Sequence, residues 1–201
     1  MPRALITRRE AAELSGISET TVKKAVDQNV VPARRRGSQS WIELEDVPVL
    51  AMLGLLSTMR LSTVHKQELR KWLRAASAPP ELELAPALVV RRVDAIEQAR
   101  LRAERYGQLR DRWIVRDPAI KNGEPVINGS HVSVHTLAER IAGDESDEVL
   151  DEDFPHIPAE AREVAVQYAR ANPRRGRPKR VSAVHEQQAR SDRQRRPDRG
   201  I

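Results

Sequence analysis

Hydrophobic and polar positions near the N-terminus follow the pattern of two short helices joined by a tight turn. Thr7 is placed to cap a helix over residues 8–14, with Glu10 completing a capping box, and a glycine follows as a stop. Ser18 is placed to cap a second helix over residues 19–28, which has one apolar face. The side chains predicted to point outward from this second helix are Thr20, Thr21, Lys23, Lys24 and Asp27.

After Pro32 the pattern changes to that of a hairpin. The stretch ARRRGSQSWIEL places Gly37 and Ser38 at a turn, and alternation resumes at Trp41. Two helices followed by a basic hairpin are typical of a winged helix-turn-helix.

The pattern in the middle of the chain predicts mainly helices. Residues 45–59 are almost wholly apolar and too short to span a bilayer, so we expect a core helix or a dimer seam. A helix over 62–76, a strand pair in ELELAPALVV and a charged helix over 91–112 follow. The charged helix carries a narrow apolar stripe, as in an arm that packs on a neighbour, formed by Val93, Ile96, Ala99 and Ala103.

From Trp113 the chain shows strand-like apolar pairs and then three short helices, over 135–141, 147–153 and 159–171. The fold class expected is mainly α, with an N-terminal winged helix-turn-helix, a helical linker and a small C-terminal three-helix domain with minor strands. The expected boundaries are 1–60, 61–112, 113–173 and a basic tail, 174–201, disordered when free.

Composition narrows the class of protein. Only 3% of residues are aromatic, so the core must rest on aliphatic side chains, and there is no cysteine to form a disulfide or a thiolate site. No run of eighteen apolar residues exists, and the N-terminus lacks an apolar signal core. We therefore expect a cytoplasmic protein without membrane association.

The net charge of +6 is unevenly spread. Residues 174–201 hold ten basic and three acidic side chains, whereas residues 1–173 hold 25 basic and 26 acidic. Within the body, residues 144–163 contain nine carboxylates against one arginine. One end of the body is therefore suited to phosphates and the other is not.

The N-terminal pattern LITRREAAELSGISETTVKKAVDQNVVPARRRG resembles the helix-turn-helix of the MerR class of regulators. The resemblance implies that the second helix enters the major groove of double-stranded operator DNA while the wing and helix N-terminus hold phosphates. The residues it nominates for DNA contact are Arg8, Ser18, Thr20, Thr21, Lys23, Lys24, Arg34, Arg35, Arg36 and Ser38. The alternative is a protein-binding fold in which the arginines form a solvated loop.

A second resemblance runs from Trp113 to Ala171, through WIVRDPAIKNGEPVINGSHVSVHTLAERI and LDEDFPHIPAEAREVAVQYA. This stretch looks like the domain-of-unknown-function family associated with VapB-type antitoxins. It departs from the family at residues 129–133, where a Thr-Arg pair is usual. The resemblance implies a cognate ribonuclease toxin of the PIN type as partner.

The acidic helix over 147–153 argues against a second DNA-reading unit, because it would place five carboxylates against phosphates. Dimerisation or partner docking fits it better. Pairing with the basic wing or tail is an equally good alternative.

The tail contains the Arg-Gly-Arg-Pro core of an AT-hook, whose arginines suit a narrow minor groove. The tail residues assigned to DNA are Arg175, Gly176, Arg177 and Pro178. An antitoxin tail that folds on the acidic active site of a toxin is the competing interpretation. The residues assigned to the toxin are Arg190, Arg193, Arg195, Arg196 and Arg199.

The sequence gives only weak signals for a metal site or for enzyme activity. His131 and His135 are four residues apart, with Glu139 beyond, but nothing around them resembles a metal centre, so no metal or cofactor is expected. The chain offers no nucleophile and base set and no phosphate-cradling glycine loop, so we do not expect an enzyme. The function expected is that of a dimeric, autorepressing antitoxin of a type II toxin–antitoxin pair. The alternative is a MerR-class transcription regulator without a toxin.

Overall fold

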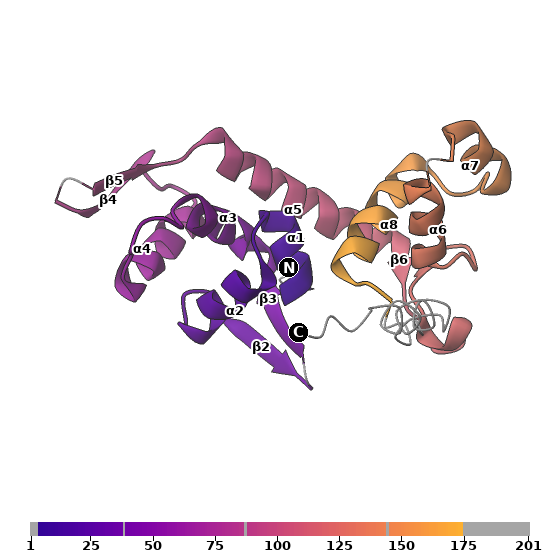
Figure 1. Ribbon diagram of the computed structural model, residues 1–201, viewed down its shortest axis with the longest axis horizontal. Coiled ribbons are helices and arrows are strands. Elements are labelled where there is room, and N and C mark those ends of the chain that lie inside the picture. The colour runs from indigo at the N-terminus through magenta and orange to yellow at the C-terminus, as the bar shows by residue number, and fades with distance from the viewer. Residues whose placement is uncertain (1–3, 38, 87, 144, 175–201) are drawn as a thin grey trace, which may run out of the picture.

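The computed structural model describes residues 4–37, 39–86, 88–143 and 145–174. These residues form eight α-helices and three small antiparallel sheets, so the protein is mainly helical. Figure 1 shows an elongated molecule in which the N-terminal elements occupy one part and the elements after residue 113 occupy the other. In the described residues, no helix combines the length and apolarity needed to cross a membrane.

The N-terminal elements are β1 (Leu5–Thr7), α1 (Arg8–Ser15), α2 (Glu19–Asp27), β2 (Ala33–Arg36), β3 (Gln39–Glu43) and the 3₁₀ turn η1 (Leu44–Asp46). The predicted capping box is present, because Thr7 and Glu10 exchange hydrogen bonds at the start of α1. Gly16 ends α1 at φ +71°, a conformation that favours glycine. Strands β1, β3 and β2 form a sheet in that order, so the predicted hairpin is flanked by a third strand.

The middle elements are α3 (Val47–Leu55), α4 (Thr63–Arg74), β4 (Glu81–Ala85), β5 (Leu88–Arg91) and α5 (Asp94–Trp113). The apolar helix predicted over 45–59 is shorter than expected, since a 3₁₀ turn precedes it and it ends at Leu55. Its first half is buried in the core, while Leu55 and Met59 are exposed. In α5 the expected stripe is buried except at Val93, which lies just before the helix and is 46% exposed.

The remaining elements are β6 (Ile114–Val115), the turn η2 (Lys121–Gly123), β7 (Val126–Ile127), α6 (Val134–Ala142), α7 (Asp147–Asp153) and α8 (Ala159–Ala171). The bounds predicted for α7 and α8 are confirmed, and α6 begins one residue earlier and ends one later than predicted. Helices α6 and α8 pack together over a core that includes Leu137 and Tyr168.

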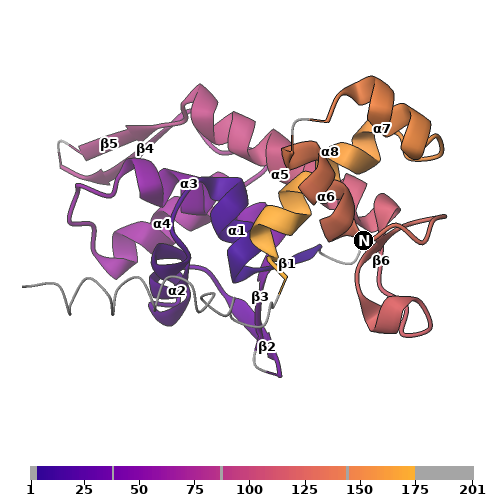
Figure 2. The same cartoon turned by 45° about the vertical axis from the view of Figure 1, so that its right-hand side comes forward.

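Two helices join the parts of the molecule. The main N-terminal core contains not only residues of α1, α2 and α3 but also Ala103 and Tyr106 of α5 and Val164 of α8. Figures 1 and 2 both show α5 running along the side of the molecule opposite the β2–β3 hairpin. A separate cluster around Trp72 holds α4, the β4–β5 hairpin and the start of α5.

Candidate nucleic-acid interface

The polar face of α2 is free for contact with a partner. Thr20, Lys23 and Lys24 are exposed, while Val22 and Ala25 bury the opposite face. Thr21 is half-buried, and its hydroxyl hydrogen-bonds with the hydroxyl of Ser18 at 2.9 Å. Ser18 Oγ also accepts from the Thr21 backbone N–H, so this hydroxyl has a structural role at the helix start.

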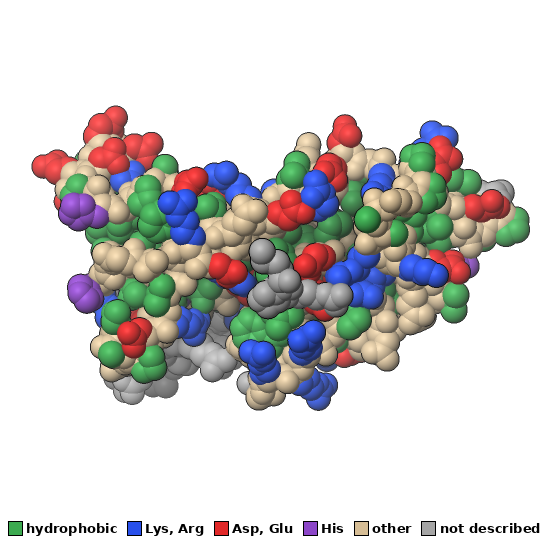
Figure 3. All heavy atoms as spheres, turned by 180° about the vertical axis from the view of Figure 1, so that it is seen from behind, with side chains coloured by type: hydrophobic (Ala, Val, Ile, Leu, Met, Phe, Trp, Pro, Cys, Tyr) green, Lys and Arg blue, Asp and Glu red, His purple; other side chains and the backbone are tan. Residues whose placement is uncertain are grey.

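The β2–β3 hairpin carries three exposed arginines in succession, Arg34, Arg35 and Arg36. They pair in register with Trp41, Ser40 and Gln39 of β3, and Gly37 enters the turn at φ +60°. Ser38, also assigned to DNA contact, lies outside the described residues. Figure 3 shows Lys and Arg side chains gathered on this hairpin, at the lower centre of the view, and acidic side chains gathered over α7 at the upper left.

The base of the hairpin is fixed by buried charge. Asp46 is fully buried and accepts hydrogen bonds from Arg70 Nε at 2.8 Å and from Arg74 Nη1 at 3.2 Å. Arg74 also pairs with Glu43 of β3 at 3.0 Å, and Arg34 approaches Glu43 at 3.9 Å. Helix α4 therefore holds the strand from which the hairpin projects, a link that sequence reasoning missed.

Helix α4 also supports the end of α2. Lys66 Nζ donates to Gln28 Oε1 at 3.0 Å, and Gln67 donates to the Asn29 carbonyl at 3.2 Å. Asn29 has φ +53°, a left-handed conformation that asparagine tolerates better than most residues. Contacts from α4 thus fix both α2 and the hairpin.

Helix α5 fixes α1 from the other side. Glu10 is 3% exposed, and its second oxygen accepts from the Tyr106 hydroxyl at 2.6 Å. Burial, with the neighbouring Glu10 carboxylate, raises the pKa of Tyr106 well above its ordinary value. Arg110 donates to the Leu5 carbonyl at 2.9 Å and lies 3.7 Å from Glu10. The capping box of α1 is therefore part of a tertiary network.

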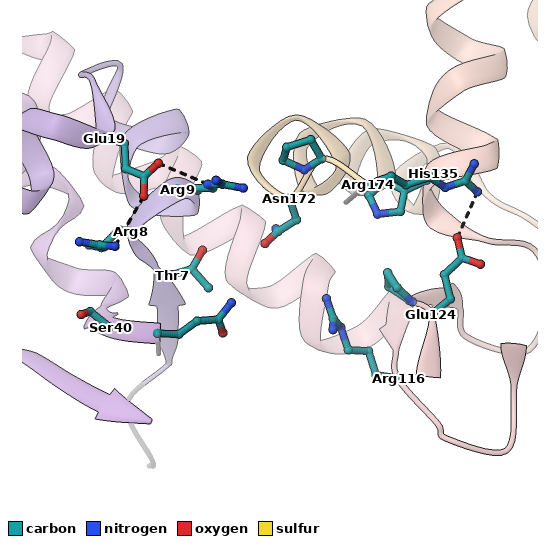
Figure 4. A pocket seen from close by; sticks show the side chains of 13 residues that line it. Thr7, Arg8, Arg9, Glu19, Ser40, Arg116, Glu124, His135, Asn172 and Arg174 are labelled. Atoms are coloured by element: carbon teal, nitrogen blue, oxygen red, sulfur yellow. Dashed lines mark hydrogen bonds and ion pairs between the residues drawn. The ribbon is translucent and has the colours of Figure 1, made fainter. Parts of the chain in front are cut away.

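Arg8, also assigned to DNA contact, is one of the residues that line a cleft. It lies 3.9 Å from Glu19, which also accepts from Arg9 Nε at 3.3 Å. The cleft has a volume of about 810 Å³ and lies between the N-terminal elements and residues that follow α5 (Figure 4). Arg8, Arg9 and Glu19 belong to one wall.

The opposite wall of the cleft carries Arg116, Glu124, His135 and Arg174. Arg174 donates to Glu124 at 3.1 Å and to Thr136 at 3.0 Å. Arg116 donates to the Tyr168 hydroxyl at 2.6 Å. Burial, and then the positive charge of Arg174, lowers the pKa of His135, which favours its neutral form.

Helix α7 is the acidic part of the surface. Asp147, Asp151 and Asp153 form ion pairs with Arg140 and Arg162, but their side chains remain between 47% and 88% exposed. Within the described ranges, no group of three or more His, Asp or Glu side chains could hold a metal ion.

The tail positions assigned from sequence lie outside the described residues. They are Arg175, Gly176, Arg177, Pro178, Arg190, Arg193, Arg195, Arg196 and Arg199.

The part of the chain after α5 is similar to a known sequence family. Residues 114–169 match the family described as "Protein of unknown function (DUF433)". This DUF433 segment covers β6 to α8 and leaves the candidate DNA-binding elements outside it.

Two other proteins are also similar to parts of this chain. The chain is 39% identical over 64 residues to "Uncharacterized protein y4eO" of Sinorhizobium fredii, a match that spans 32% of this chain and 29% of that relative. It is also similar to the crystal structure of Rv2018 from Mycobacterium tuberculosis, with 15% identity and a TM-score of 0.40, over 80% of this chain and 96% of that one.

Proposed function

We propose that this protein is the antitoxin of a type II toxin–antitoxin pair, which binds operator DNA as an autorepressor and neutralises a PIN-type ribonuclease toxin. The observation that carries the DNA-binding part is the pairing of an exposed polar helix face with an exposed arginine hairpin. Lys23 and Lys24 lie on α2, and Arg34, Arg35 and Arg36 lie on β2.

In this proposal, residues 1–60 act as a winged helix-turn-helix of the MerR type. Helix α2 enters the major groove, where Thr20 and Lys24 reach base edges, and the hairpin lies along the phosphate backbone. The two surfaces need a fixed spacing to contact one duplex. The network of Asp46 with α4, and the contacts of α4 with Gln28 and Asn29, supply that rigidity.

Toxin neutralisation is proposed for residues beyond the DNA-reading elements. The resemblance of residues 113–171 to a family associated with antitoxins supports this assignment. The toxin-binding residues proposed lie in the tail between Arg190 and Arg199, where an arginine-rich segment suits the acidic active site of a metal-dependent nuclease.

The DNA-binding assignment is tested by replacing Arg34, Arg35 and Arg36 together with alanine. Each lost phosphate contact removes about one unit from the slope of log K against log salt, so we expect a slope smaller by up to about three. The matched control replaces Arg91, Arg100 and Arg102, which carry the same charge but lie on β5 and α5. Equal slopes in both triple variants would refute the wing as a DNA contact.

Toxin neutralisation is tested with a chain that ends at residue 181. The proposal predicts that this chain retains operator affinity at moderate salt but fails to protect cells that express the neighbouring nuclease-like gene product. Full protection of the cells by the shortened chain would refute the assignment of toxin binding to the tail. If no such gene lies beside this one, the remaining function is that of a regulator without a toxin.

Dimerisation is part of the proposal, because most regulators of this kind bind palindromic DNA as twofold dimers. Sedimentation at micromolar concentration measures it directly. A monomer both free and DNA-bound would contradict it.

A further inference from the structure

The cleft between the N-terminal elements and the DUF433 segment is a feature that the proposed function leaves unused. Its volume of about 810 Å³ falls within the range of small-molecule sites. Four arginines and two glutamates line it, so its formal charge is positive. The walls come from parts of the chain that are more than a hundred residues apart in sequence, at Arg8 and Arg116.

The two glutamates in the cleft form ion pairs with three of these arginines, yet some guanidinium N–H groups still have no hydrogen-bond acceptor in the described part of the chain. Glu19 pairs with Arg8 and Arg9, and Glu124 pairs with Arg174. Arg9 uses only Nε in a hydrogen bond, and Arg116 uses only one terminal nitrogen, toward Tyr168. The other N–H groups of these two guanidinium groups have no hydrogen-bond partner among the described residues.

Arg9 and Arg116 stand on opposite walls, and Figure 4 shows both side chains extending into the space between the walls. Guanidinium groups with free, planar donors are suited to bidentate contact with phosphate. The neutral groups on the walls, among them Thr7, Ser40 and Asn172, can hydrogen-bond to the uncharged part of a ligand.

We propose that this cleft binds a phosphate-bearing ligand of nucleotide size, whose anionic groups lie between Arg9 and Arg116. The ligand contacts both walls, so it stabilises one arrangement of the N-terminal elements relative to the DUF433 segment. Two sources supply this chemistry, a free phosphorylated small molecule or the phosphodiester backbone of DNA that continues from the hairpin. The site itself does not depend on DNA binding by the hairpin.

The experiment is calorimetric titration of the full chain with inorganic pyrophosphate, repeated with the double variant Arg9→Ala/Arg116→Ala. A charge-assisted hydrogen bond contributes enough that each arginine should account for about tenfold in affinity, so we expect a loss of about a hundredfold. The control is Arg91→Ala/Arg102→Ala, which removes the same charge outside the cleft and should leave the affinity unchanged. Arg116→Lys, which retains the charge, should keep more affinity than Arg116→Ala, and thermal melting checks that each variant is folded.

Salt-dependent DNA binding by the same proteins distinguishes the two sources. One outcome is that the Arg9→Ala/Arg116→Ala variant loses pyrophosphate binding while its slope of log K for DNA against log salt is unchanged. This outcome supports a free phosphorylated small molecule as the ligand. The other outcome is that the parent protein does not bind pyrophosphate and that the slope of log K for DNA against log salt is smaller by about two in the Arg9→Ala/Arg116→Ala variant. This outcome supports the DNA backbone as the ligand. If pyrophosphate does not bind and the DNA slope is unchanged, or if cleft and control variants lose binding equally, the proposal is overturned. The Arg34, Arg35 and Arg36 variant reports on the hairpin separately.

Discussion

The N-terminal elements and the DUF433 segment use charged residues in opposite ways. In the N-terminal part, Glu10, Glu43 and Asp46 are all less than 9% exposed, and each contacts a side chain from a distant helix. In the DUF433 segment, the aspartates of α7 are exposed and pair with Arg140 and Arg162 of the same segment. Buried carboxylates fix the positions of elements, whereas exposed ones leave a surface on which a partner can act. The comparison therefore separates charge that builds the fold from charge that is available for binding.

The largest expected effect is that of Asp46→Ala. The change removes the buried partner of Arg70 and leaves Arg74 with Glu43 alone, and removing one member of a buried ion network costs about 3 kcal/mol of unfolding free energy. The matched change is Asp153→Ala on α7, whose side chain is 47% exposed and whose partner Arg140 keeps its pair with Glu145, so the loss should be about 0.5 kcal/mol or less. Urea unfolding measures both, and similar losses would show that the two parts do not differ in this way.

A smaller effect is expected from removing a tyrosine hydroxyl in each part. Tyr106→Phe leaves one oxygen of the buried Glu10 carboxylate, Oε1, without its hydrogen-bond donor, which costs about 2 kcal/mol. Tyr168→Phe removes an acceptor from Arg116, which is exposed and can bind water instead, so the cost is about 0.5 kcal/mol. Thermal and urea unfolding of the two variants test this ranking, and the reverse order would contradict it.

The smallest effect concerns pH and a residue of the DUF433 segment. Burial and Arg174 lower the pKa of His135, although Glu124 and Glu139 act in the opposite direction. The unfolded chain therefore takes up this proton first, and stability decreases as the pH falls below the unfolded value of about 6.5. In His135→Gln, the thermal midpoint should fall less between pH 7.5 and 5.5, whereas the exposed His131→Gln should behave like the parent. Identical pH profiles of stability for all three proteins would argue against His135 as a source of the pH dependence.

Local signals in the sequence predicted local structure well. The capping residues Thr7 and Ser18 begin α1 and α2 as expected, and the bounds of α7 and α8 follow from Ser146 and from the proline before Ala159. These features depend on residues within one turn of each other, so their physical cause is contained in a short window. The exposed positions of Lys23 and Lys24 followed from the helical periodicity of residues 19–28.

Features that depend on tertiary contacts were not predicted. The carboxylates of Glu43 and Asp46 look like surface charges in sequence, and nothing local indicates that Arg70 and Arg74 bury them. The cleft was missed for the same reason, because Arg9 and Arg116 are brought together only by the packing of α1 and α5 against α8. Residues 144–163 were identified correctly as acidic, but their partners are largely Arg140 and Arg162 of the same segment. The assignment of Arg8 to a DNA contact stays a prediction.

The position of α5 also bears on whether residues 114–169 form a self-contained structural unit. The DUF433 match begins at residue 114, immediately after the helix ends at Trp113, so the recurring sequence unit excludes α5. Yet Trp113 packs against both cores, and Arg105 binds Glu163 of α8. A gene rearrangement that transferred residues 114–169 alone would expose the face of α8 that α5 covers. In this protein, the stretch that matches the family therefore relies on a helix outside it to cover one face of α8.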